Sequence, residues 1–153
     1  LVRYGGKVGS WISHIYVDNE DSLHGGLDIW QLPKQLACFT WNDHQITVAQ
    51  GNQPLCVLDY QPTRLRLPQS WPPRISGNVL SSLSSDLLCF TSHFQGAIAI
   101  THSHLTIPET SPFSHLHLGQ PWLTLHSPQI NLRVDAPITI GTCTQPGRNP
   151  MSQ

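Results

Sequence analysis

Residues 45–60 read QITVAQGNQPLCVLDY, with an apolar run on either side of Gly51-Asn52. β-Branched residues favour strands, and a short glycine-containing connection between two such runs is typical of a β-hairpin. The preceding run, Leu36 to Trp41 (LACFTW), is also short, apolar and rich in aromatic residues. This region therefore predicts antiparallel strands in the first half of the chain.

Further short strands are predicted after this hairpin, at 87–91, 97–102, 122–126, 130–134 and 138–143. We expect the first two to pair with each other, and likewise the next two, because turn residues separate them. Thirteen prolines and eleven glycines interrupt the chain too often for long helices. The sequence thus predicts an all-β fold, a β-sandwich of short antiparallel strands.

The N-terminal segment allows two interpretations. Its apolar residues Val8, Trp11 and Ile15 fall at helical spacing, yet residues 11–17 (WISHIYV) also suit a strand. A helix preceding the sandwich therefore stays open as an alternative. The stretch 18–26 (DNEDSLHGG) is expected to form a polar, flexible loop.

The length of 153 residues fits one domain with a core of its own. We expect a single β-rich domain over residues 1–144 and a flexible C-terminal tail over residues 145–153. The chain begins at Leu1 without a methionine, which is expected of a processed or truncated product.

Charged residues are few, at 11% against about a quarter in typical soluble domains. A formal net charge of -1 argues against a nucleic-acid partner, which needs a concentrated basic face. The basic cluster Arg64, Arg66 and Arg74 surrounds a proline-rich bend and is predicted to be a solvated edge. We expect an extracytoplasmic protein, periplasmic or secreted.

The four cysteines stand singly, at positions 38, 56, 89 and 143. This spacing is poor for a zinc finger or a redox motif. Cys38, Cys56, Cys89 and Cys143 could form two disulfides with three possible connectivities, and the alternative is four reduced core cysteines.

Histidines spaced two apart occur at His102-Ser103-His104, and two residues apart on a strand share a face. With Gly96 before them and Glu109 after them, they form the string G-x5-H-x-H-x4-E. This string resembles the first metal motif of the cupin family. The resemblance implies His102, His104 and Glu109 as ligands of one transition-metal ion, as an alternative to a protein without a cofactor.

Five tryptophans are a large aromatic load for this length. Trp11, Trp41 and Trp122 lie within apolar patterns and are predicted to be in the core. Trp30 and Trp71 lie beside polar residues and are candidates for an exposed contact surface, because amphipathic aromatics are enriched at interfaces.

Signals for catalysis are weak. The sequence has no G-x-S-x-G element and no glycine-rich phosphate loop, and its nine acidic residues are scattered. We therefore predict a protein that is not an enzyme and has no catalytic residues.

The stretch from Leu55 to Val134 resembles the soluble domain of minor pseudopilins and type IV pilin-like proteins. The resemblance is carried by LLCFTSHFQG (87–96), AIAIT (97–101) and WLTLHSPQINLRV (122–134). It implies a periplasmic assembly subunit with disulfides, which packs against sister subunits and reaches the membrane only through an N-terminal helix that this sequence lacks. The rival interpretations are a secreted or viral β-sandwich that binds a host protein or glycan, and the cupin-like metal protein.

Overall fold

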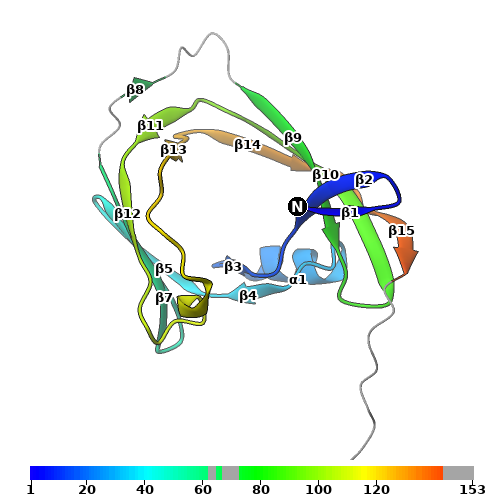
Figure 1. Cartoon of the computed structure of the whole chain (residues 1–153), viewed down its shortest axis with the longest axis horizontal. Coiled ribbons are helices and arrows are strands. Elements are labelled where there is room, and N and C mark those ends of the chain that lie inside the picture. Colours follow the sequence, from blue (N-terminus) through cyan, green and yellow to red (C-terminus); the bar gives the residue numbers. More distant parts are fainter. Residues whose placement is uncertain (62–64, 67–72, 143–153) are drawn as a thin grey trace, which may run out of the picture.

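The computed structural model describes residues 1–61, 65–66 and 73–142 of the chain. About 55% of the residues are in strands and 9% are helical, in several largely antiparallel sheets. The predicted all-β fold is therefore confirmed. The predicted tail, residues 145–153, lies outside the described residues. In Figure 1 the strands follow one another around a ring, with the helix α1 (Glu20–Asp28) at one side of it.

The largest sheet has the order β1-β2-β9-β10-β14, and β15 also pairs with β10. Its strands are β1 (Val2–Tyr4), β2 (Lys7–Trp11), β9 (Arg74–Ser81), β10 (Asp86–Gly96), β14 (Ile130–Val134) and β15 (Ile138–Thr142). β10 is eleven residues long, so it serves two neighbours on the same edge. Its first part pairs with β15, and its second part pairs with β14.

The remaining strands form three smaller sheets. One has the order β12-β7-β6-β5, one the order β13-β11-β8, and the last is the parallel pair β3-β4. Their bounds are β3 (Ile15–Val17), β4 (Lys34–Leu36), β5 (Cys38–Asn42), β6 (Gln45–Gln50), β7 (Gln53–Tyr60), β8 (Leu65–Arg66), β11 (Ala99–Thr101), β12 (Ser103–Thr106) and β13 (Thr124–His126). The helices are α1 (Glu20–Asp28) and the short 3-10 helix η1 (Ser114–Leu116).

The hairpin predicted from residues 45–60 is present as β6 and β7, with Ile46 opposite Leu58 and Val48 opposite Cys56. Gly51 in its turn has φ +56°, a left-handed conformation that glycine adopts without a steric penalty. The pairings predicted further along the chain are wrong. β10 runs straight through to Gly96, β11 pairs with β13 and β8, and β14 pairs with β10. β10 and β11, and likewise β13 and β14, are adjacent in sequence but join different sheets.

The N-terminal segment takes the strand interpretation, as β2 and β3. The loop predicted over residues 18–26 is wrong, because α1 begins at Glu20. Asn19 is the N-cap, and its Oδ1 accepts a hydrogen bond of 2.9 Å from the Ser22 backbone N–H. Glu20 and Asp21 add negative charge to the first turn, where it interacts favourably with the helix dipole.

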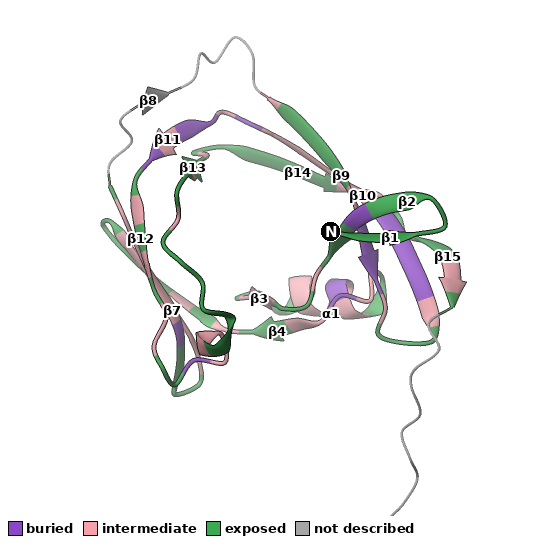
Figure 2. Cartoon of the chain, in the orientation of Figure 1, coloured by how far each residue is buried: buried purple, intermediate pink, exposed green. Residues whose placement is uncertain are grey.

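The core is small and centres on β10 and β9. Leu32, Val79 and Phe90 form a buried cluster, against which the half-buried Trp30 and Val134 pack. Buried residues also concentrate in the first half of β10 and in β11 (Figure 2). Among the described residues, no helix is long and apolar enough to cross a membrane.

The tryptophans contradict their predicted placement. Trp41 is 65% exposed and Trp122 93% exposed, and Trp11 is also exposed, so these three are not core residues. Trp41 lies on β5, an edge strand, and no neighbouring sheet covers it. Trp30, predicted to be a contact residue, packs against the core cluster instead. A local apolar pattern did not reveal which sheet faces the fold would cover.

Candidate active site

One of the two lysines in the chain, Lys34, lies at the corner where α1 meets β4. It opens β4, which pairs in parallel with β3 so that Lys34 stands opposite Ile15. Its side chain is half-buried and extends along α1. The Nζ donates hydrogen bonds to the Ser22 carbonyl oxygen at 2.8 Å and to the Ser22 Oγ at 2.9 Å. The first turn of α1 therefore holds the end of the lysine.

The absence of a side chain at Gly26 makes room for this lysine. Gly26 is buried within α1, and a Cβ built on it would overlap the Cδ and Cε atoms of Lys34. Glycine lowers helix stability by about 1 kcal/mol relative to alanine. Its presence in α1 is explained by the close approach of the Lys34 stem.

Hydrogen bonds to distant parts of the chain fix the connection between α1 and β4. Gln31 has φ +46°, a left-handed conformation that costs a non-glycine residue about 1–2 kcal/mol. Its Oε1 accepts hydrogen bonds from the backbone N–H groups of Leu83 at 3.1 Å and Ser84 at 3.2 Å. The strained turn three residues before Lys34 is thus fixed by the β9–β10 connection, and such strain is common at functional sites.

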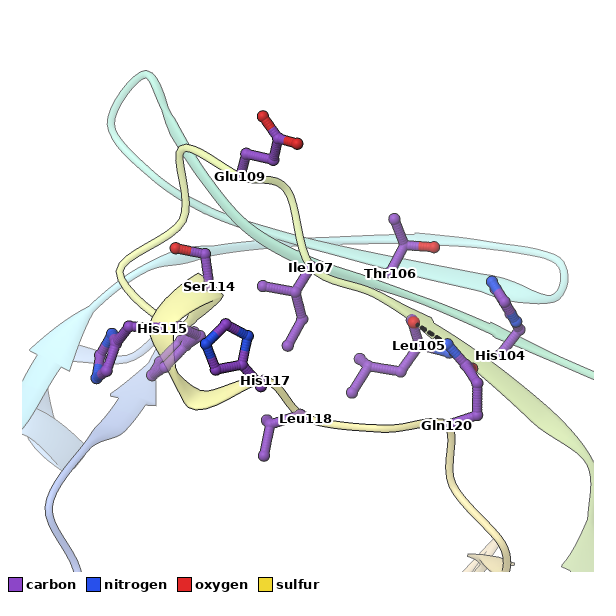
Figure 3. Close-up of a pocket in the computed structure, with 11 residues that line it drawn as sticks. His104, Leu105, Thr106, Ile107, Glu109, Ser114, His115, His117, Leu118 and Gln120 are labelled. Carbon is purple, nitrogen blue, oxygen red and sulfur yellow. Dashed lines mark hydrogen bonds between the residues drawn. The ribbon is translucent and has the colours of Figure 1, made fainter.

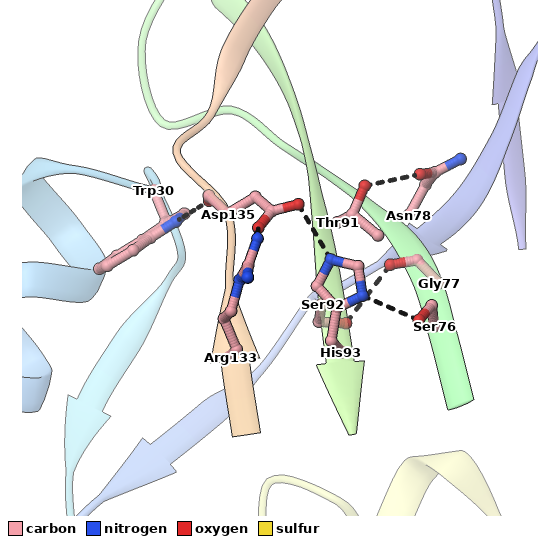
Figure 4. A network of polar contacts seen from close by, with 9 residues as sticks. All are labelled: Trp30, Ser76, Gly77, Asn78, Thr91, Ser92, His93, Arg133 and Asp135. Carbon is pink, nitrogen blue, oxygen red and sulfur yellow. Dashed lines mark hydrogen bonds and ion pairs between the residues drawn. The ribbon is translucent and has the colours of Figure 1, made fainter. Parts of the chain in front are cut away.

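Trp30 fixes the same connection from the other direction. Its indole Nε1 donates a hydrogen bond of 3.0 Å to the Asp135 carbonyl oxygen, which follows β14 (Figure 4). Its own carbonyl oxygen accepts a hydrogen bond from the Ser81 hydroxyl. The backbone leading to Lys34 is therefore attached to the largest sheet at two points.

Burial lowers the pKa of the Lys34 ammonium from its usual value of 10.5. The physical cause is partial desolvation, which disfavours the charged form of the amine. A lysine with a lowered pKa carries more of the neutral, nucleophilic amine at neutral pH. The arrangement can therefore present an amine able to attack a carbonyl group.

The predicted metal ligands are divided between two depressions. His104 and Glu109 line a pocket of about 850 Å³ together with His115 and His117, and the Glu109 carboxylate points away from the imidazoles (Figure 3). His102 lines a different pocket, which His104 also borders. In the described part of the chain, no group of three or more His, Cys, Asp or Glu side chains is arranged to hold a metal.

The remaining predicted site residues are scattered. Cys38, Cys56 and Cys89 are free thiols, on β5, β7 and β10 respectively, so none of them bonds to another. Burial raises the pKa of the Cys56 thiol. Cys143 and Trp71 lie outside the described residues.

Fold and site together define an all-β protein that presents a partly desolvated lysine amine from the corner of a helix and a strand. The family model of acetoacetate decarboxylase (ADC) matches residues 1–83, more than half of the chain. The chain therefore belongs to the acetoacetate decarboxylase family.

A solved structure described as "Structural Studies of Acetoacetate Decarboxylase" is similar to this chain, with a TM-score of 0.60 and 12% sequence identity. The match covers 93% of this chain and 66% of that one, and at this identity the likeness concerns the fold. A search of curated protein sequences finds no match.

These findings overturn the functional interpretation of the sequence. The family bears the name of a decarboxylase, so the predictions of a pilin-like assembly subunit and of a protein that is not an enzyme are wrong. The predicted packing against sister subunits of a filament is wrong for the same reason. Neither the glycan-binding sandwich nor the cupin-like metal protein receives support. The strand pattern that suggested a pseudopilin is common to many all-β folds, and its strand pairings are not those observed.

Sequence reasoning missed Lys34 altogether. The available signal was scarcity: a chain with two lysines in 153 residues places one of them between Leu32 and Leu36, in the largely uncharged stretch 29–37 (IWQLPKQLA). A rare charged residue in such a stretch is a candidate for partial burial. What no local pattern could indicate is that α1 covers it.

Proposed function

We propose that this chain decarboxylates a β-keto acid and that Lys34 is the amine that forms an imine with the substrate. The observation that carries the proposal is the half-buried Lys34 amine, whose pKa is lowered by burial, inside the segment that the family model matches. Acetoacetate decarboxylase is itself the reference example of a lysine activated by a lowered pKa to form an imine with a carbonyl substrate. Acetoacetate is therefore the first substrate to test.

The chemistry follows from an amine and a ketone placed β to a carboxylate. The neutral Lys34 Nζ attacks the ketone carbon, and loss of water gives a protonated imine. The bond to the carboxylate then breaks, CO2 leaves, and its electron pair passes into the imine to give an enamine. Protonation at carbon and addition of water release the shortened ketone and return the free amine. The net reaction consumes one proton per CO2 released.

The surroundings of Lys34 suit the first step. Ser22 offers two acceptors that hold the Nζ at the first turn of α1, and Gly26 fixes the path of the stem. The neutral amine has two N–H donors for these two acceptors, and its lone pair stays available to attack the ketone carbon. Partial burial keeps the amine neutral more often than on an exposed surface.

Reductive trapping tests the proposal directly. Incubation with acetoacetate and sodium borohydride is expected to reduce the imine and leave a stable adduct, which peptide mass spectrometry locates on Lys34. The Lys34→Arg variant should carry no adduct, whereas Lys7→Arg, which changes the other lysine on the exposed strand β2, should trap like the parent protein. An adduct on Lys7, or equal labelling of both lysines without dependence on substrate, would contradict the assignment.

A further inference from the structure

A second group of polar side chains lies on the β9–β10–β14 part of the largest sheet. The register places His93 opposite Ser76 on β9 and opposite Arg133 on β14. Two residues further along β10, Gln95 stands opposite Arg74 on β9 and opposite Asn131 on β14. Directly opposite residues share a face, and so do residues two apart on a strand. These six side chains therefore project from one face of the sheet in two neighbouring rows. We call this group the donor cradle; it consists of Ser76, His93 and Arg133 in one row and Arg74, Gln95 and Asn131 in the other.

The donor cradle is hollowed. Its six residues, with Phe94, line a pocket of about 370 Å³ that no carboxylate lines among the described residues. Asp135 lies beside it and binds two cradle residues: its Oδ2 is 2.9 Å from the His93 Nε2, and its Oδ1 accepts from the Arg133 Nη2 at 3.0 Å. These contacts keep the pKa of Asp135 below its usual value, with the hydrogen bond to His93 as the larger cause. The Asp135 carboxylate therefore holds the His93 and Arg133 side chains in position.

The donor capacity of the cradle exceeds what these contacts use. A guanidinium group has five N–H donors. Arg133 directs its Nε and Nη2 to Asp135, which leaves its Nη1 without a hydrogen-bond partner in the described part of the chain. Arg74 is exposed and has no hydrogen-bond or ion-pair partner among the described residues. Gln95 and Asn131 add amide groups from the row that contains Arg74.

The geometry suits one small anion. Neighbouring strands lie about 4.8 Å apart, so β9 and β14 are separated by roughly 10 Å across β10. Arginine side chains from these two strands can reach an anion seated above Gln95 and His93. Guanidinium groups bind carboxylate and phosphate oxygens with charge-assisted hydrogen bonds, often in pairs. Arg74, which has no ion-pair partner in the described part of the chain, is one of only eight basic residues in the sequence.

We propose that the donor cradle binds a small oxyanion, a carboxylate or a phosphate, between Arg74 and Arg133. Lys34 is not among the residues that line this pocket, so the proposed anion site does not include the imine-forming amine. Arg74 supplies the principal charge, Arg133 the second, and the Gln95 and Asn131 amides complete the set. Both ring nitrogens of His93 are engaged, Nε2 by Asp135 and Nδ1 by the Ser76 Oγ at 2.9 Å, so His93 forms part of the wall of the site and does not donate to the anion.

Calorimetric titration of the whole chain with inorganic phosphate, at constant ionic strength, tests the proposal. Saturable binding with one site is expected, and a parallel titration with succinate distinguishes the phosphate from the carboxylate class. Arg74→Gln should weaken binding about tenfold or more, because it removes a charge-assisted interaction. Arg3→Gln, which removes the same charge from the exposed strand β1, should bind like the parent protein.

Four outcomes decide the matter. Equal weakening by Arg74→Gln and Arg3→Gln would show general charge screening and overturn the site, as would the absence of saturation with both anions. Arg133→Gln serves as the second variant, and thermal unfolding checks that each variant is folded. Binding that persists unchanged in Lys34→Arg supports a site of its own, whereas binding lost in that variant would place the anion at the lysine and overturn the cradle.

Discussion

The two lysines of the chain lie in opposite environments. Lys7 opens β2, is exposed, and follows a turn with two left-handed glycines, Gly5 and Gly6. Lys34 opens β4, is half-buried, and extends along a helix that ends in a strained turn. Both begin a short strand near the N-terminus, so secondary structure does not distinguish them. The difference is the helix packed over one of them and not over the other.

That difference teaches how an ordinary side chain becomes reactive. An exposed ammonium keeps its hydration, whereas partial burial withdraws water from Lys34 and lowers its pKa. The protein accepts local costs to achieve this, namely a buried glycine inside α1 and a left-handed Gln31. The hydrogen bonds of Trp30 with Asp135, after β14, and of Gln31 with Leu83, in the β9–β10 connection, offset these costs.

The largest expected effect separates the two lysines by activity. Lys34→Arg should reduce acetoacetate decarboxylation to the uncatalysed rate, because a guanidinium cannot form the imine. Lys7→Arg should leave kcat and KM unchanged. Release of CO2, followed by a coupled assay, measures both variants. A Lys34→Arg protein that is folded and retains its kcat would remove the basis for distinguishing the lysines.

A smaller but still large effect is expected from the helix that covers Lys34. In Gly26→Ala the new methyl group overlaps the Lys34 stem, so the flexible side chain must move and Nζ is displaced from Ser22. Displacements of about 1 Å at a reacting group can cost roughly 100-fold in rate. Gly25→Ala is the matched control, because its Cβ would lie 3.7 Å from Trp30, an ordinary contact. Steady-state kinetics should show the loss in Gly26→Ala alone, and equal rates in both variants would refute the steric argument.

The fold could be predicted from the sequence as far as local patterns determine it. Ile46 and Val48 alternate with polar neighbours, residues 55–58 form an apolar run, and the turn between the two contains a glycine, so the β6–β7 hairpin followed directly. α1 was missed because Gly25-Gly26 are typical of a loop, although Asn19 before two acidic residues is an N-cap signal. The glycines are explained only by the packing of Lys34, which the linear sequence does not contain.

The candidate site depended on contacts between distant residues, which is why it was not predicted. Trp30 and Asp135 are 105 residues apart, and the donor cradle joins three strands whose order the sequence did not indicate. The histidine pair His102 and His104 attracted attention because its members are close in sequence. In the described part of the chain they join no group of three metal-ligating side chains, and Glu109 lines a pocket that His102 does not reach, while single residues such as Lys34 gain their chemistry from burial.

The anchoring of the Lys34 connection predicts a moderate effect on stability. Trp30→Phe removes the indole N–H bond to the Asp135 carbonyl oxygen and should lower the free energy of unfolding by about 1 kcal/mol. Trp41→Phe, at an exposed edge position, should change it by less than about 0.5 kcal/mol. Urea denaturation followed by circular dichroism measures both. A larger loss in Trp41→Phe than in Trp30→Phe would mean that the core position of Trp30 does not stabilise the fold.

The smallest expected effect concerns the acceptors that hold the amine. The Ser22 hydroxyl accepts a hydrogen bond from Lys34 and so favours the charged ammonium over the neutral amine. In Ser22→Ala this support is lost while the backbone acceptor remains, so the pKa of Lys34 should fall further below 10.5. The acid limb of the pH–rate profile should then move to lower pH, because the neutral amine forms earlier as pH rises. Ser13→Ala, at an exposed serine that contacts His14, should not move it. A shift to higher pH in Ser22→Ala would show that the hydroxyl favours the neutral amine, and a profile identical to the parent would mean that the limb reports a group other than Lys34.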